Sequence, residues 1–344
     1  MNTNLDKLHL FIAQKIPFLF GWSLRKQSKN KASLSHSILD KRTPFIVPFL
    51  LLLPALVLIT MFTLVPMGMN IIYSFTHRQG GFTFENYKEV FTSSRFAVGV
   101  RNSFIYGLFV LPFVLMISLT VSSVIAKLVR KGTKSFWQTI FFMPYVTNAV
   151  AVSLAFIQLF SKNGLFNSLI GSNVAWLDTT DQYTFNALVA MIINGIWSGL
   201  AFNILIFTTA MMGVDKNLYK SASIDGCGEI KQFFSITLPS IKGTINFIVT
   251  LAIIGGLKVF PLALFENNPN NAFNRGGGTL MLYIYLVTQS GDFYASGAAS
   301  LSLFIIGVTF SSIIRGGFFM IQLTLNTLGE RNVWVKVKTS KEIN

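Results

Sequence analysis

Charged residues are scarce in this 344-residue chain. Only 12% of its residues are Asp, Glu, Lys or Arg, whereas a soluble globular domain typically has about 25%. Acidic residues are fewer than basic residues, with 13 Asp and Glu against 28 Lys and Arg. This composition argues against an ordinary soluble enzyme.

Cysteine and histidine are also nearly absent, which limits the available chemistry. Cys227 is the only cysteine, so an intramolecular disulfide is impossible and a thiolate metal cluster is not expected. His9, His36 and His77 are too scattered for a zinc motif or a catalytic pair. No Gly-Lys pair occurs, so the chain lacks the phosphate loop of ATP-binding proteins. We expect no catalytic residue, no metal and no cofactor in this chain.

Long apolar segments dominate the sequence. A helix needs about 20 apolar residues to cross ~30 Å of hydrocarbon, and continuous runs of this kind indicate helices rather than barrel strands. None of the six segments contains an acid, and only the last two contain a basic residue, Lys258 and Arg315. The sequence therefore predicts an all-α, polytopic membrane protein with six transmembrane helices. The predicted spans are Phe45–Tyr73, Phe104–Ala126, Thr139–Phe160, Phe185–Met212, Thr244–Phe265 and Ala298–Gln322.

The basic residues lie mostly on one side of these spans. Of the 28 Lys and Arg, 21 fall in the two terminal stretches and in loops 127–138 and 213–243, and seven fall on the other side. Basic loops favour the cytoplasmic side, so we expect a multi-pass protein of the cell membrane with both termini in the cytoplasm. The net charge of +15 is then expected to reflect contact with membrane lipids, and no nucleic-acid partner is expected.

This topology divides the chain into three parts. A basic, amphipathic tail covers 1–43, the six-helix domain covers 44–325 with its long cytoplasmic loop 213–243, and a cytoplasmic tail covers 326–344. Within the first tail, Leu8–Trp22 is apolar but too short to span. Its basic flank follows it, which favours a segment on the inner leaflet over a signal peptide; a loosely ordered tail is the alternative.

The spans lack the acids with which ion-driven carriers commonly bind a proton or sodium ion. This absence counts against a self-contained secondary transporter, which stays as the alternative, and the lack of clustered acids, His or Cys counts against a membrane-embedded enzyme. If the chain is a transporter, its energy is expected from outside the chain.

The cytoplasmic loop 213–243 has the pattern of two short helices. Residues 217–225 form the first, Gly226 supplies a left-handed residue that ends it, and 229–238 form the second, whose run stops at Pro239. About 30 residues exceed what a simple connection needs, so this helix–turn–helix indicates a partner surface. One apolar face is expected on the second helix, formed by Ile230, Phe233 and Phe234.

This loop resembles the coupling motif of permease subunits of binding-protein-dependent ABC importers. The motif is Glu-Ala-Ala-x-x-x-Gly, then nine residues and Ile-x-Leu-Pro. The matching residues are Lys220-Ser221-Ala222, Gly226, Ile236, Leu238 and Pro239, while Asp225 and Phe233 fit the carbohydrate-type variant. The resemblance covers roughly residues 45–325 and includes Leu53–Leu56, Phe62, Pro66, Tyr73–Phe75, Asn86-Tyr87, Arg101–Ser103, Phe142–Tyr145 and Gly255–Phe260.

The resemblance implies the type I ABC importer permease fold and a set of partners. These are a second six-span permease subunit, expected as a heterodimer, two ATPase subunits that bind ATP and Mg, and an extracellular binding protein or lipoprotein. The implied substrate is a sugar or a related polyol or glycerol phosphate. Residues implied at the ATPase contact are Tyr219, Lys220, Ala222, Asp225, Gly226, Phe233 and Pro239.

Two segments depart from the family pattern. Lys220 stands where the motif has an acid, so the family's salt bridge to an ATPase arginine is not expected in this half. The polar segment Asn267–Gly278 replaces the usual Thr-x-Gly-Gly-Pro after the fifth span.

Polar residues inside the spans are candidates for the substrate path, because such groups tend to face a bundle interior or a water cavity. For the Asn and Gln residues an interhelical hydrogen bond is the alternative, and for Trp197 it is packing. Lys258 is expected in a gate or structural role rather than as a phosphate site. The candidates are Asn148, Gln158, Asn194, Trp197, Asn203 and Lys258.

Overall fold

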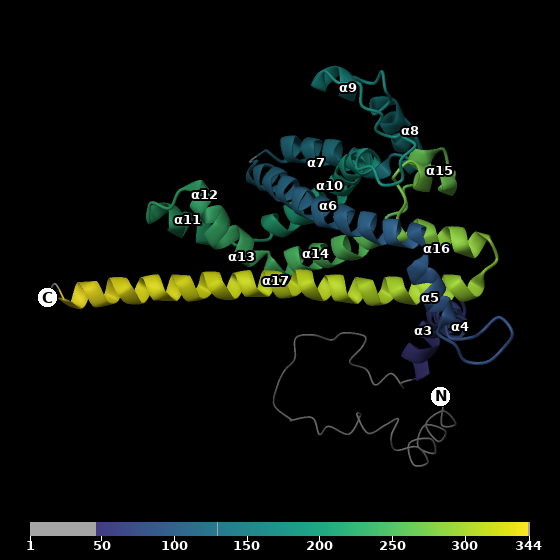
Figure 1. Ribbon diagram of the computed structural model, residues 1–344. Coiled ribbons are helices and arrows are strands. Elements are labelled where there is room, and N and C mark those ends of the chain that lie inside the picture. The colour runs from purple at the N-terminus through teal and green to yellow at the C-terminus, as the bar shows by residue number, and fades with distance from the viewer. Residues whose placement is uncertain (1–45, 129, 343–344) are drawn as a thin grey trace, which may run out of the picture. The chain divides into compact units, whose positions relative to one another are not determined.

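The computed structural model describes residues 46–128 and 130–342 (Figure 1). The tail predicted over 1–43, with its apolar segment Leu8–Trp22, lies outside the described residues. The chain divides into two compact units, Met1–Met69 and Asn70–Asn344, and each is described by itself.

The described part of the first unit is helical. It comprises α3 (Ile46–Ile59), the π-helical segment η2 (Thr60–Leu64) and the beginning of α4 (Val65–Ser74). Apolar residues dominate this stretch, and Pro48–Ser74 is long enough to cross a membrane.

The second unit is also built from helices, and the described residues hold no strand beyond the isolated bridge between Thr76 and Phe82. The all-α fold class is therefore confirmed. Its helices are α5 (Glu85–Thr92), α6 (Ser94–Lys127), α7 (Lys131–Val146), α8 (Ala149–Leu159), α9 (Leu165–Ile170), α10 (Asn186–Met212), α11 (Lys216–Ile224), α12 (Glu229–Gln232), η3 (Phe233–Thr237), α13 (Leu238–Ser240), α14 (Lys242–Leu257), η4 (Leu262–Phe265), α15 (Pro269–Asn274), α16 (Leu280–Gln289) and α17 (Phe293–Glu342).

Five helical segments among the described residues are long and apolar enough to cross a membrane, and a bent pair of helices makes a sixth if it is counted as one span. These numbers agree with the six predicted spans. The five segments are Pro48–Ser74, Ser94–Lys127, Asn186–Met212, Lys242–Phe265 and Phe293–Gly317.

The bent pair corrects the prediction of a continuous third span over Thr139–Phe160. Here α7 and α8 meet at an angle of 89°. Pro144 lies in the last turn of α7, and Thr147 is extended after it. Asn148 then caps α8, because its side-chain oxygen accepts from the backbone N–H of Val150 at 2.8 Å. A proline and an N-cap residue this close together end one helix and start another.

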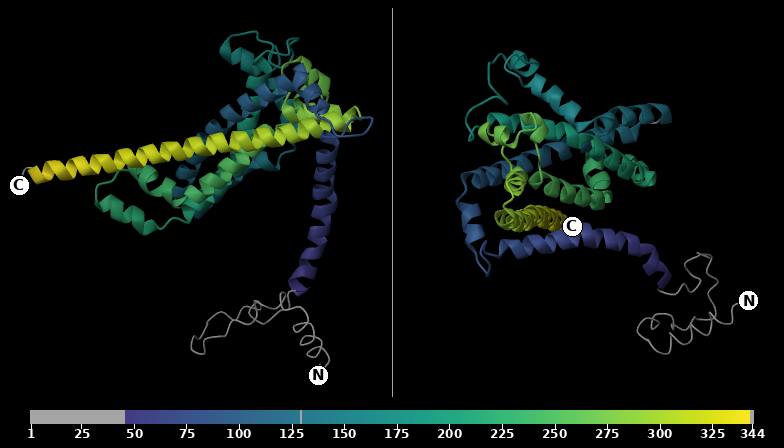
Figure 2. Two further views of the ribbon diagram at one scale, coloured as in Figure 1. Left: turned by 60° about the horizontal axis from the view of Figure 1, so that its bottom comes forward. Right: turned by 90° about the vertical axis from the view of Figure 1, so that its right-hand side faces the viewer.

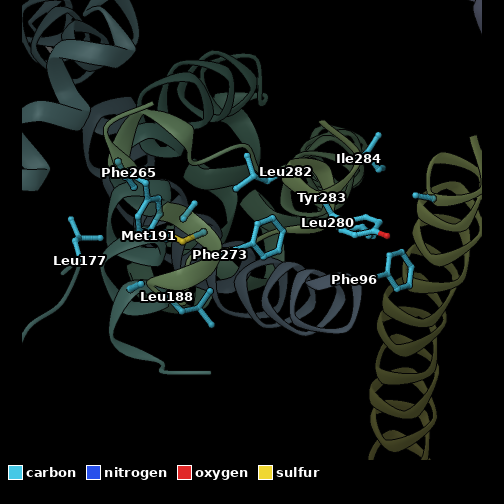
Figure 3. Packing of buried hydrophobic residues seen from close by; sticks show 14 of the residues in the cluster. Phe96, Leu177, Leu188, Met191, Phe265, Phe273, Leu280, Leu282, Tyr283 and Ile284 are labelled. Carbon is cyan, nitrogen blue, oxygen red and sulfur yellow. The ribbon is translucent and has the colours of Figure 1, made fainter. Parts of the chain in front are cut away.

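Close packing of α6 with its neighbours organises the second unit. A Cβ added to Gly256 of α14 would lie 2.9 Å from the Cα of Gly107 in α6, so the two backbones meet directly there. Another part of the core is formed by the aromatic residues Phe265 and Phe273 with Met191 and Leu280 (Figure 3). Figures 1 and 2 show α11 and α12 at one end of this unit and α15 at the other.

The last helix is longer than its predicted span. α17 continues from Phe293 to Glu342, past the boundary that the sequence places between the membrane domain and the tail at 326.

Candidate functional site

The loop that the sequence singles out forms a helical hairpin over Lys216–Ser240, from α11 to α13. Asp215 begins it, since its carboxylate accepts from the backbone N–H of Asn217 at 2.9 Å. Gly226 ends α11 with φ of 72°, as predicted. The backbone N–H of Cys227 donates to the carbonyl of Ala222 at 2.8 Å, and that of Gly226 to Ser223 at 3.1 Å. These two bonds form a Schellman motif, which fixes the backbone conformation of the turn between the two arms.

The second arm departs from prediction at its end. Helical backbone runs through α12, η3 and α13 as far as Ser240, and the break falls at Ile241. The expectation that the run stops at Pro239 is wrong. A proline has no N–H for the carbonyl four residues earlier, and here the backbone widens into the π-helical turn Phe233–Thr237 just before it.

Side-chain hydrogen bonds join the two arms. The hydroxyls of Tyr219 and Thr237 are 2.8 Å apart. The Gln232 amide donates both to the hydroxyl of Ser223 and to the carbonyl of Cys227, at 2.9 and 2.8 Å. Since Thr237 is buried, the bond to Tyr219 is protected from water. The hairpin is thus braced as one body.

The hairpin also contacts the bundle at two points. Phe233 packs against the buried cluster that includes Phe207 and Ile248. Lys127, the last residue of α6, lies 2.7 Å through its Nζ from Oε2 of Glu229, the first residue of α12. The hydrogen bond and the charge of Lys127 lower the pKa of Glu229. These contacts connect the hairpin to α6 and to the bundle core.

The predicted partner-contact residues occupy different sides of the hairpin. Lys220, Asp225, Gly226 and Pro239 are exposed. The remaining three are half-buried: Tyr219 bonds to Thr237 of the other arm, Phe233 packs against the bundle core, and Ala222 supplies a carbonyl of the Schellman motif. The structure thus separates the predicted set into exposed residues and bracing residues.

The exposed apolar surface of the hairpin differs from the expected face. Ile230 and Phe234 are exposed, at 78% and 63%, but Phe233 is turned to the core. Ile224, which the sequence did not single out, is 87% exposed. These exposed apolar residues are candidates for an interaction surface, and the signal for Ile224 was its place at the end of α11, two residues before Gly226.

Two cavities lie between the bundle helices. The first, of about 400 Å³, is lined by residues of α6, α10 and α14, including Asn203 and Gly256. The second, of about 320 Å³, is lined by Ser153 and Asn194 among others. Tyr106 and Tyr145 line both. Aromatic rings with a few polar groups are typical of sites for small polar ligands.

The six substrate-path candidates divide between these cavities and other places. Asn203 and Asn194 line the first and the second cavity, and Nδ2 of Asn194 is buried without a hydrogen-bond partner in the described part of the chain. Asn148 instead caps α8. Gln158, Trp197 and Lys258 are exposed and line neither cavity, and Lys258 follows the last turn of α14. Sequence reasoning missed Tyr106 and Tyr145.

A polar anchor fixes the segment after the fifth span. Asn102 is fully buried, and its amide donates to the carbonyls of Gly276 and Gly278 at 2.9 and 2.8 Å. Ser103 accepts from the backbone N–H of Leu280 at 3.0 Å. A Cβ at Gly278 would come within 2.2 Å of the Phe273 ring, so only glycine fits. The departure at Asn267–Gly278 is thus a packed structure that contains α15.

Possible metal ligands do not converge in the described residues, which contain no group of three or more His, Cys, Asp or Glu arranged to hold an ion.

Comparison with known proteins places these features in a family. Residues 116–319 match the model of the binding-protein-dependent transport system inner membrane component. The chain is 43% identical over 312 residues to the "Probable ABC transporter permease protein MG188" of Mycoplasma genitalium, covering 88% of this chain and 94% of that one.

More distant relatives extend the comparison. The multiple sugar-binding transport system permease protein MsmF of Streptococcus mutans is 29% identical over 269 residues, covering 75% of this chain and 90% of that one. A bacterial alginate ABC transporter, solved in complex with an alginate pentasaccharide-bound periplasmic protein, has the same fold. Its TM-score is 0.63 at 22% identity, over 77% of this chain and 91% of that one. With helices of this number and a family match over most of its length, the chain belongs to the binding-protein-dependent transport system inner membrane components, the permeases of ABC importers.

Proposed function

We propose that this chain is one of two permease subunits of an ATP-driven importer for a sugar or a related polyol or glycerol phosphate. The observation that carries the proposal is the braced hairpin Lys216–Ser240, which presents exposed apolar residues outward and is joined to α6 through Lys127 and Glu229. The names of the sugar-transport relatives support the substrate class.

The partners follow from what the chain lacks. We expect ATP and Mg to be bound by two separate ATPase subunits, and the chain itself to hydrolyse nothing. A second six-span subunit completes the path, and an extracellular binding protein delivers the substrate, as the solved alginate transporter supports. The excess of basic residues in the hairpin loop and the terminal stretches supports a cytoplasmic location for both termini and the hairpin.

Coupling then works as a two-state change. ATP binding closes the ATPase subunits, and each carries the hairpin seated in it. Because the arms are tied by Tyr219–Thr237 and by the Schellman turn at Gly226, the hairpin moves without bending. Phe233 and Glu229 pass this motion to the bundle, where one conformation opens outward and the other inward.

The path for the substrate runs through the two interhelical cavities. Tyr106 and Tyr145 offer aromatic faces to a sugar ring, and Asn194 offers an unpartnered amide to a hydroxyl. A buried polar group without a partner is costly, so a hydrogen bond from the Asn194 amide to a substrate hydroxyl favours binding.

The test is a substitution in the turn, in the complex reconstituted with its ATPase and binding protein. Gly226→Asp places a side chain at φ of 72°, which strains the turn. We expect insertion to persist and substrate-stimulated ATP hydrolysis to be lost. Gly228→Ala is the matched control, because Gly228 has φ of −66° and open space for a Cβ, and it should couple normally.

Two results would contradict the proposal. Normal coupling in Gly226→Asp would show that the hairpin does not transmit the motion. Uptake by the chain alone, driven only by an ion gradient in vesicles, would instead establish the secondary transporter.

A further inference from the structure

A separate cavity of about 800 Å³ lies between the hairpin and the bundle. Its lining comes from the last turns of α6 and α10, the first turn of α7 and the inner side of the hairpin. It shares no residue with the two cavities of the proposed substrate path. Its volume lies in the range of about 300–1,000 Å³ that is typical of small-ligand sites.

The cavity is strongly basic. Four lysines line it, while Glu229 is its one acidic residue. Lys127 is neutralised by the ion pair with Glu229, and Lys134 donates to the carbonyl of Ala126 at 3.0 Å, which does not reduce its charge. Three positive charges thus remain without an acid in the lining of this cavity, on Lys131, Lys134 and Lys216.

Two of these charges occupy an unfavourable place in their helix. Lys131 is the first residue of α7 and Lys134 lies three positions later on the same side. The amino end of a helix carries a partial positive charge and disfavours cations, and the residue before it, Arg130, adds another and makes no side-chain cap. An anion bound in the cavity relieves both the helix-end repulsion and the repulsion among the lysines.

Part of the lining is apolar. Met211, Met212, Val214 and Phe233 lie there with Leu128. A soluble anion such as free phosphate gains nothing from these side chains, whereas an amphiphile can place its polar head against the lysines and its apolar part against these residues. Lys127 and Met212 end two membrane helices, so the cavity is at the level where lipid headgroups lie.

We propose that this cavity binds the headgroup of an anionic phospholipid. Basic pockets between membrane helices on the cytoplasmic side are suited to such headgroups, and the proposal rests on the cytoplasmic placement of the hairpin in the proposed function. Tyr219, Gln232 and Phe233 of the hairpin line the same cavity as Lys131 and Lys134. The bound lipid therefore contacts both sides of the joint and makes coupling dependent on the lipid.

Cys227 provides the probe, because it is the only cysteine in the chain and it lines this cavity. The full-length chain is placed in nanodiscs of phosphatidylcholine, with or without phosphatidylglycerol. Two quantities are measured: the rate at which N-ethylmaleimide alkylates Cys227, and the phosphatidylglycerol retained by the chain in native mass spectrometry. We expect phosphatidylglycerol to be retained in preference and to slow the alkylation.

Substitutions then locate the effect. Each lysine near an anionic surface contributes about fivefold in binding, so Lys131→Gln with Lys134→Gln should weaken retention on the order of 25-fold and abolish the protection. Lys131→Arg with Lys134→Arg should keep both, which shows that charge and not folding is responsible. Lys242→Gln is the matched control, since Lys242 is exposed on the same side of the proposed topology and does not line the cavity.

Three results would overturn the proposal. One is equal retention and protection in the wild type and in the Gln double variant. Another is protection by inorganic phosphate in neutral nanodiscs, which would make the cavity a site for a soluble anion. The third is protection by the purified ATPase subunit in neutral nanodiscs, which would make it a protein contact. A failure of the proposed function would appear as normal coupling in Gly226→Asp. Lipid retention is measured independently of coupling, so it still tests the cavity.

Discussion

Lys127 at the end of α6 and Glu229 at the start of α12 form an ion pair at 2.7 Å, although 102 residues separate them. Both side chains are more than half exposed, so water and salt weaken their attraction. The ion pair is important because of where it lies. It connects a long membrane helix directly to the hairpin, and it lies at the edge of the basic cavity.

The pair gives a pH dependence with a definite sign. The pKa of Glu229 is lowered from its ordinary value of 4.5, chiefly by the hydrogen bond from Lys127. A lowered folded-state pKa means that the stabilisation is fully present above pH 4.5 and is lost as the pH falls through the lowered value. Thermal unfolding of wild type and Glu229→Gln, followed against pH, should show a difference at neutral pH that disappears as the pH falls from 4.5 through the lowered pKa of Glu229. A difference that grows on acidification would contradict this account.

Tyr219→Phe should loosen the hairpin without disturbing the membrane helices. The change removes one hydroxyl and leaves the buried Thr237 hydroxyl without this bond, a loss of about 0.5–1.5 kcal/mol. We expect a lower unfolding temperature and less transport per ATP hydrolysed. Thr237→Val alone should have a similar effect, and the double variant should cost little more than either single change. Additive effects would show that the two residues act separately.

Alanine substitutions at the neighbouring glycines Gly255 and Gly256 of α14 should differ in their effect on stability. A Cβ at Gly256 would lie 2.9 Å from Gly107, whereas one at Gly255 meets nothing within 4 Å. Gly256→Ala should force α6 and α14 apart and destabilise the chain by about 1–3 kcal/mol. Gly255→Ala should be neutral or slightly stabilising, because alanine favours the helix. Unfolding temperatures in detergent measure both, and equal effects would refute the close approach of the two helices.

Substitutions of Asn194 and Asn148 should have different effects, one on transport and the other on stability. The amide nitrogen of Asn194 is buried without a partner in the described residues and lies at a cavity, so Asn194→Ala should preserve stability and raise the KM for uptake. Asn148 caps α8, and Asn148→Ala should lower stability by about 1 kcal/mol. Uptake kinetics and thermal unfolding of both variants check the assignment. The reverse pattern would place the path elsewhere.

Local patterns predicted the parts of the fold that depend on neighbouring residues. The apolar runs predicted the spans, and a single glycine predicted the end of α11, because φ of 72° at Gly226 is a property of that residue and its two flanking turns. The tendency of polar side chains in apolar helices to face a bundle interior or a cavity suggested six substrate-path candidates, of which Asn203 and Asn194 line the two cavities.

Contacts between distant segments were beyond the reach of such patterns. Lys127 and Glu229 look like ordinary loop charges until α6 and α12 are placed side by side. Asn102 gives no sign in the sequence that it holds the carbonyls of Gly276 and Gly278. The break at Thr147 had two signals, Pro144 and Asn148, but an unbroken apolar run outweighed them, and only packing against α10 and η4 decides the direction of α8.

The right-angled corner between α7 and α8 has a consequence for hydration. Carbonyls next to a proline and an extended residue have no helical donor, and inside a bilayer such groups are tolerated only against protein or at a water-filled cavity. Pro144, Thr147 and Ala149 all line the cavity that contains Asn194. In the importer proposed above, we therefore expect the backbone carbonyls of this corner to be hydrated by water in that cavity, and a polar solute that enters it to replace this water.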